Sequence, residues 1–122
     1  MSIQIGAATI LKIIQDSPME GYGNGARALE AWGAHNFKAS EASDRYGLSW
    51  LLFKVDGTLF QGWVRVALRG IDIPTDSGVF SISLEKFNNN TAEYGTTQVQ
   101  HGVKSTDLAS TIDRLVEGDS KR

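Results

Sequence analysis

Two adjacent residues, Asp56 and Gly57, restrict the fold of this 122-residue chain more than any other feature. An Asp-Gly pair between two stretches of alternating polar and apolar residues is among the strongest short-range signals for a tight β-hairpin turn. The flanking stretches run from Leu48 to Val55 and from Thr58 to Arg69. The sequence therefore predicts a central antiparallel hairpin whose strands are joined by a two-residue loop.

A two-residue loop would also fix which residues lie opposite one another. Val55 would face Thr58, and further from the turn Trp50 would face Trp63. Successive side chains of a strand point to opposite faces of a sheet, so this pairing sorts the hairpin into two faces. One face is apolar throughout and continues into a third strand from Val79 to Phe87. We expect it to be the core face, with these members: Leu51, Phe53, Phe60, Val64, Val66, Leu68, Phe80, Ile82 and Leu84.

The opposite face of the hairpin is more apolar than a solvated face should be. It carries Leu48, Trp50, Leu52, Leu59, Trp63, Lys54, Gln61, Arg65 and Arg69. Arg65 would be close enough to stack on an indole. Grouped aromatic and arginine side chains are enriched at binding hot spots, and an exposed apolar patch marks a binding surface. The expected binding residues are Trp50, Gln61, Trp63, Arg65 and Arg69.

Two other interpretations of this face stay open at the level of sequence. The loop from Gly33 to Gly47, or the second helix, would bury it as a second small core. A second copy of the chain would cover it in a homodimer, because symmetric pairs are common.

The remaining elements complete an α+β fold. Apolar spacing predicts a first helix over residues 6–16, and Asn24 is a suitable N-cap for a second short helix that Gly33 would end. Residues 38–46 are polar and are expected to form a loop. A fourth strand is expected near residues 93–103, and Ser105 would cap a C-terminal helix. We expect an antiparallel meander of three to four strands, with the N- and C-terminal helices packed on one face.

Composition narrows the function classes. Residues 1–122 fit a single domain, and the absence of cysteine excludes disulfides and thiolate chemistry. His35 and His101 stand in no recognised metal-ligand spacing, so we expect no metal or cofactor. No secretion signal or membrane span is visible, which predicts a cytoplasmic protein. A net charge of −2 disfavours nucleic acid as the main partner.

Four segments of the chain resemble a group of small uncharacterised proteins encoded by phages and mobile elements. The segments are Gly33-Ala34-His35-Asn36-Phe37, Leu52-Phe53-Lys54-Val55, Val64-Arg65-Val66-Ala67-Leu68, and the stretch from Val103 to Leu115. The resemblance implies an α+β fold and a mobile-element origin. It brings no catalytic residue with it.

The function expected from these observations is non-enzymatic binding of a protein partner, or of a second copy, through the Trp50, Trp63 and Arg65 face. An inhibitor of a host system would suit the size and the implied origin, by analogy. Single-stranded nucleic acid is the alternative ligand, because indoles and arginines on a sheet can stack on bases and contact phosphates. An enzyme with an unrecognised site is the third class.

Overall fold

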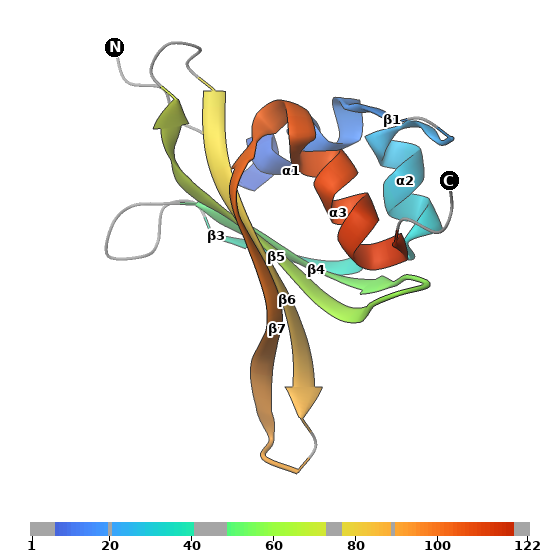
Figure 1. The fold of residues 1–122 in the computed structure, drawn as a ribbon, viewed down its shortest axis with the longest axis vertical. Coiled ribbons are helices and arrows are strands. Elements are labelled where there is room, and N and C mark those ends of the chain that lie inside the picture. Colours follow the sequence, from blue (N-terminus) through green and yellow to red (C-terminus); the bar gives the residue numbers. More distant parts are fainter. Residues whose placement is uncertain (1–6, 20, 41–48, 73–76, 89, 119–122) are drawn as a thin grey trace.

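The chain folds as an α+β domain in which one antiparallel sheet carries helices on one face (Figure 1). The structure is a computed structural model that describes residues 7–19, 21–40, 49–72, 77–88 and 90–118. The five strands form a meander in the order β3-β4-β5-β6-β7. They are β3 (His35–Ser40), β4 (Trp50–Asp56), β5 (Gln61–Asp72), β6 (Ser77–Asn88) and β7 (Glu93–Lys104). The predicted fold class is confirmed, with one strand beyond the expected range.

The helices begin and end close to the expected positions. They are α1 (Ala7–Asp16), α2 (Gly25–Ala31) and α3 (Leu108–Glu117), with a short hairpin of β1 (Pro18–Met19) and β2 (Gly23–Asn24) before α2. Asn24 caps α2 as predicted, because its side chain accepts a 3.0 Å hydrogen bond from the Arg27 amide. Gly33 ends α2 with a φ of +68°, a conformation that glycine adopts readily.

The predicted role of Ser105 as a helix cap is wrong. A short 3-10 turn, η1 (Ser105–Asp107), precedes α3. The Ser105 hydroxyl instead donates a 3.3 Å hydrogen bond to the Gly78 carbonyl, so it ties η1 to the start of β6.

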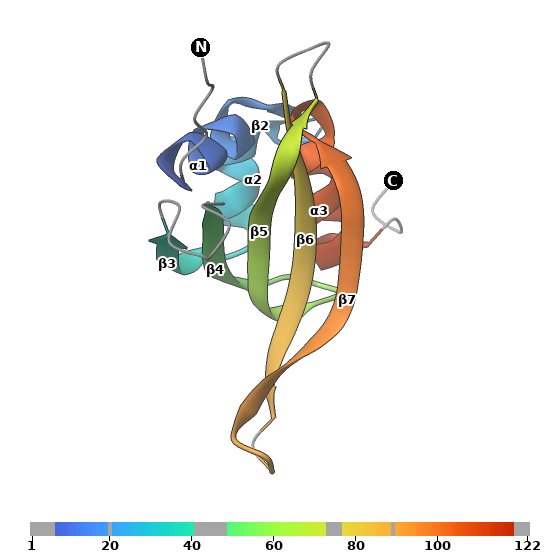
Figure 2. The same cartoon turned by 90° about the vertical axis from the view of Figure 1, so that its left-hand side faces the viewer.

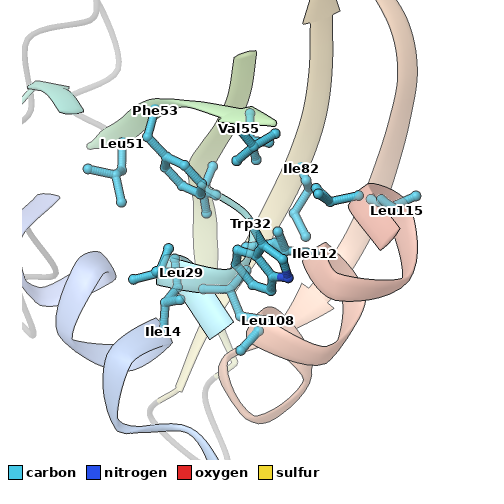
Figure 3. Packing of buried hydrophobic residues seen from close by; sticks show 14 of the residues in the cluster. Ile14, Leu29, Trp32, Leu51, Phe53, Val55, Ile82, Leu108, Ile112 and Leu115 are labelled. Carbon is cyan, nitrogen blue, oxygen red and sulfur yellow. The ribbon is translucent and has the colours of Figure 1, made fainter. Parts of the chain in front are cut away.

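The core lies between the helices and one face of the sheet (Figure 3). Every second residue of the central strands faces inward, and the members Phe53, Val64, Val66, Phe80 and Ile82 are completely buried. The helices supply matching apolar side chains: Ile10, Ile14, Leu29, Leu108, Ile112 and Val116. The predicted core face of the sheet is therefore confirmed for these strands.

Trp32 belongs to this core, and its indole nitrogen forms a hydrogen bond with a buried carboxylate. Its indole nitrogen donates a 2.9 Å hydrogen bond to Asp113 Oδ1 of α3. The Tyr22 hydroxyl donates to the same oxygen, also at 2.9 Å. Asp113 is 8% exposed, so the two donors replace the water molecules that the carboxylate loses on burial. This contact joins the segment around α2 to α3.

The expectation of a loop over residues 38–46 is wrong for its first three positions. Residues 35–40 form β3, which pairs with β4 at the edge of the sheet. The pairing contains a bulge between His35 and Lys38, and Asn36 has a φ of +56°. An edge strand tolerates polar residues and bulges because one side has no neighbouring strand. Residues 41–46 lie outside the described part of the chain.

The two-residue turn at Asp56 and Gly57 is also wrong. Asp56 pairs with Gln61, so four residues, Gly57 to Phe60, connect β4 to β5. A two-residue turn of that type needs a positive φ at its central residues, and Gly57 has none. The connection instead runs against the C-terminal end of α3. The amides of Leu59 and Phe60 donate to the Val116 carbonyl at 2.8 and 3.0 Å.

Glu117 strengthens this contact from the helix side. Its carboxylate is 6% exposed and accepts a 2.6 Å hydrogen bond from the Thr58 hydroxyl. The Thr58 amide lies 3.3 Å from the same oxygen. The connection therefore satisfies both a terminal carbonyl of α3 and a buried carboxylate, which a two-residue turn would be too short to do.

Gly57→Ala tests this packing. An added Cβ would overlap the Val116 side chain and lie 2.7 Å from the Val116 carbonyl oxygen, which is backbone. We expect the free energy of unfolding in urea to fall by about 1–3 kcal/mol, the usual cost of overpacking. Gly70→Ala is the matched control, because a Cβ there meets nothing within 4 Å, and its effect should stay within about 0.5 kcal/mol. Equal effects of the two substitutions would contradict the packing.

Candidate functional site

The candidate site is the outer face, which we define as the sheet surface opposite the helices. In Figure 2, strands β5 to β7 lie in front of α3, and no described helix covers them. Strand register places on this face the described side chains of Lys38, Trp50, Leu52, Lys54, Asp56, Gln61, Trp63, Arg65, Ala67, Ser81, Ser83, Glu85 and Val99. Hydrogen bonds to Ser81 place Arg69 and His101 on the same face. The second helix packs on the core side, so it does not bury the outer face.

The five expected binding residues lie on the outer face. Trp50, Trp63 and Arg65 are half-buried, and Gln61 and Arg69 are exposed. Leu59, which was expected beside them, instead lies in the connection that packs against α3 and is 67% exposed. Leu48, expected on the same face, lies outside the described residues.

The expected pairing of the two indoles is wrong. Trp50 lies opposite Ala67, and Trp63 lies opposite Lys54. The two tryptophans are therefore offset by four residues along the strands, which corresponds to about 13 Å. They share a face without forming a cross-strand pair.

Each indole instead has a cation over its ring. The Arg65 guanidinium carbon lies 4.8 Å from the centroid of Trp50, which confirms the expected stacking. The Lys38 amine lies 5.2 Å from the centroid of Trp63. Both distances fall within the range of an attractive cation–π interaction. The outer face thus presents two separate aromatic–cation pairs, contributed by β3, β4 and β5.

Arg65 is fixed by a second interaction. Its Nε donates to Glu85 Oε2 at 2.9 Å, and the two side chains are 33% and 16% exposed. A guanidinium that is stacked on an indole and bonded to a carboxylate has lost most of its conformational freedom before any partner arrives. Glu85 lies on the same face as expected, and it neutralises only one of the cations there.

Cations outnumber carboxylates on β3, β4 and β5 of the outer face. The one carboxylate that these strands place there among the described side chains is Asp56. The cations are Lys38, Lys54, Arg65 and Arg69. The whole chain has a net charge of −2, so this face differs in sign from the rest of the protein.

Other kinds of site find no support in the described residues. They contain no group of three or more histidine, cysteine, aspartate or glutamate residues arranged to hold a metal ion. Among the same residues, no helix is both long and apolar enough to cross a bilayer. Comparisons with protein-family models, with curated proteins and with solved structures found no match.

Sequence reasoning missed Lys38 and the group formed by Ser81 and His101. The polar segment around Lys38 predicts a loop, whereas Lys38 lies in β3. The position of Ser81 on the outer face can be deduced from the alternation of β6 once the register is known. His101 reaches the face through a bulge that it forms with Gly102, which has a φ of +67°. The glycine was the one available sequence signal for that bulge.

An engineered disulfide tests the register that separates the indoles. The chain has no cysteine, so Asp56→Cys combined with Gln61→Cys would introduce one directly opposed, exposed pair. Directly opposed Cα atoms lie about 4.5–5.5 Å apart, within the reach of a disulfide. We expect this variant to lose both free thiols on mild oxidation and to form no disulfide between chains.

Leu52→Cys combined with Gln61→Cys is the control. These positions would be opposite only if the turn had two residues, and in the structure they are offset by four residues, about 13 Å. This variant should keep its thiols. Oxidation of the control in preference to the first pair, measured by thiol titration and mass, would contradict the register.

Proposed function

We propose that this protein is a non-enzymatic binding protein whose outer face contacts an acidic surface of another protein. The observation that carries the proposal is the pair of tryptophans on a sheet face that no described helix covers, each beneath a cation. Tryptophan and arginine dominate binding energy at protein interfaces, and they do so where the contact excludes water.

The rigidity of Arg65 supports this proposal. Binding costs free energy when mobile side chains must be ordered. Arg65 is already held between Trp50 and Glu85 in the folded protein, so its side chain needs little further ordering when a partner binds. Lys38 and Lys54 lie exposed on the same face, next to Trp63, and favour an approaching carboxylate.

A second copy is a less complementary occupant. A symmetric dimer through this face would place the same patch against itself. Such a dimer would bring together two patches in which cations outnumber carboxylates on β3, β4 and β5, which is unfavourable when water is excluded. The foreign acidic protein avoids this repulsion.

Single-stranded nucleic acid is the second candidate, because the same cations would attract phosphates. Bases bind such sheets by stacking on aromatic rings. Here Lys38 and Arg65 already occupy one side of each indole. A base would have to displace a cation or use the other side of a half-buried ring, so the geometry favours a protein.

Lys38→Glu tests the proposal, with Lys12→Glu as the matched control. Both lysines are exposed, but Lys12 lies on α1, where it pairs with Asp16. Tagged wild type and Lys12→Glu should retain the same partner protein from producing cells. Lys38→Glu should weaken the complex rebuilt from purified proteins by about tenfold or more, because it replaces attraction with repulsion.

Three results would contradict the proposal. The partner could bind Lys38→Glu as tightly as wild type. The solution mass of the wild type could show a dimer that Lys38→Glu dissociates, which would assign the face to a second copy. Salt-sensitive binding of an oligothymidine, lost in Lys38→Glu, with no protein partner retained would assign it to nucleic acid.

A further inference from the structure

Three side chains of the outer face meet at one hydroxyl group. Arg69 Nε lies 3.3 Å from Ser81 Oγ, and His101 Nδ1 lies 3.0 Å from the same oxygen. The two nitrogens can therefore be no farther apart than the sum of these distances. Ser81 holds an arginine and a histidine from the two strands on either side of it next to each other.

The backbone is shaped to make this contact. Strand β5 has a register shift between Leu68 and Gly70, which makes Arg69 the extra residue. Strand β7 has a second shift, where His101 and Gly102 lie opposite Ser81. Bulges re-aim side chains and are frequent next to functional sites. Strand β7 thus departs from regular pairing at Ser81, and β5 departs from it close by, between the partners of Phe80 and Val79.

The hydroxyl is buried, and the two side chains bonded to it are exposed. Ser81 is 2% exposed, whereas Arg69 and His101 both reach the surface. Because both side chains bond to the Ser81 hydroxyl, they contribute to its cover.

The hydrogen bonds to Ser81 use one nitrogen of each surface group. Arg69 donates through Nε, so Ser81 Oγ accepts that bond. The direction of the bond between Ser81 Oγ and His101 Nδ1 depends on the imidazole tautomer. When Ser81 donates it, the imidazole proton lies on Nε2, away from Ser81. Among the described residues, none bonds to the terminal nitrogens of Arg69. Among the described residues, no carboxylate forms an ion pair with either side chain.

We propose that Arg69 and His101, anchored by Ser81, bind an oxyanion, a carboxylate or a phosphate group. The planar guanidinium matches the geometry of such a group, and the imidazole adds a second donor close by. Ser81 is the positioning residue. The assignment of this oxyanion to a partner protein rests on the proposed function, but the site itself does not.

A nucleophilic role for Ser81 fits the geometry less well. Its hydroxyl lies close enough to a histidine for base activation. However, the oxygen is buried and accepts a bond from Arg69, so an electrophile would have to displace both covering side chains. Anion binding uses the same three residues as they stand.

Titration of the isotope-labelled protein with inorganic phosphate tests the inference, with acetate as the carboxylate probe and ionic strength held constant with chloride. We expect saturable NMR shifts of the Arg69 Nε–H and of the residue 81 and 101 amides. Arg69→Gln and His101→Gln should each weaken binding about tenfold, the usual effect of losing a charge-assisted hydrogen bond. Ser81→Ala should weaken binding while leaving the fold intact.

Lys12→Gln is the matched control, because it removes an exposed cation on α1, outside the outer face, and should leave the affinity unchanged. The inference is overturned if neither ion gives saturable shifts, or if Arg69→Gln and Lys12→Gln weaken binding equally. Saturation at this site combined with a partner that ignores Lys38→Glu would support the oxyanion site and refute the proposed function. The two proposals can therefore fail separately.

Discussion

The hydrogen bonds from the Leu59 and Phe60 amides to the Val116 carbonyl determine the geometry of the sheet. A helix end leaves carbonyl groups without partners, and here the connection between β4 and β5 supplies donors for one of them. The connection needs four residues to reach the helix, and this length sets the strand register. The neighbours across β4 and β5 on the outer face follow from that register.

The faces of the sheet were predictable from the sequence, but the partners across the strands were not. The expected and observed pairings of Trp50 differ by four residues, from Trp63 to Ala67. An even shift keeps each side chain on its face, so the core and outer faces stayed as expected. The same shift exchanges every neighbour, which is why the predicted indole pair is replaced by two indoles with a cation over each. The local preference for a two-residue turn is overridden by the contact between the connection and α3. In that contact Thr58 bonds to Glu117, which lies almost sixty residues later in the chain.

The parts of the site that escaped prediction depend on irregular backbone. Lys38 reaches Trp63 because β3 resumes regular pairing after a bulge, and His101 reaches Ser81 through another. Bulges carry little sequence signal apart from an occasional glycine such as Gly102. Arg65 could be foreseen next to an indole because both lie on strands whose alternation is clear. The third tryptophan, Trp32, could be assigned to a helix, but its bond to Asp113 required the packing of α2 against α3.

The central claim is that the four-residue connection places one cation over each indole instead of placing the indoles together. Side-chain NOEs in the wild-type protein test it most directly. The account predicts NOEs from the Lys38 methylenes to the Trp63 ring and from the Arg65 methylenes to the Trp50 ring, with upfield shifts of those methylenes. NOEs between the Trp50 and Trp63 rings, with none from either cation, would contradict it.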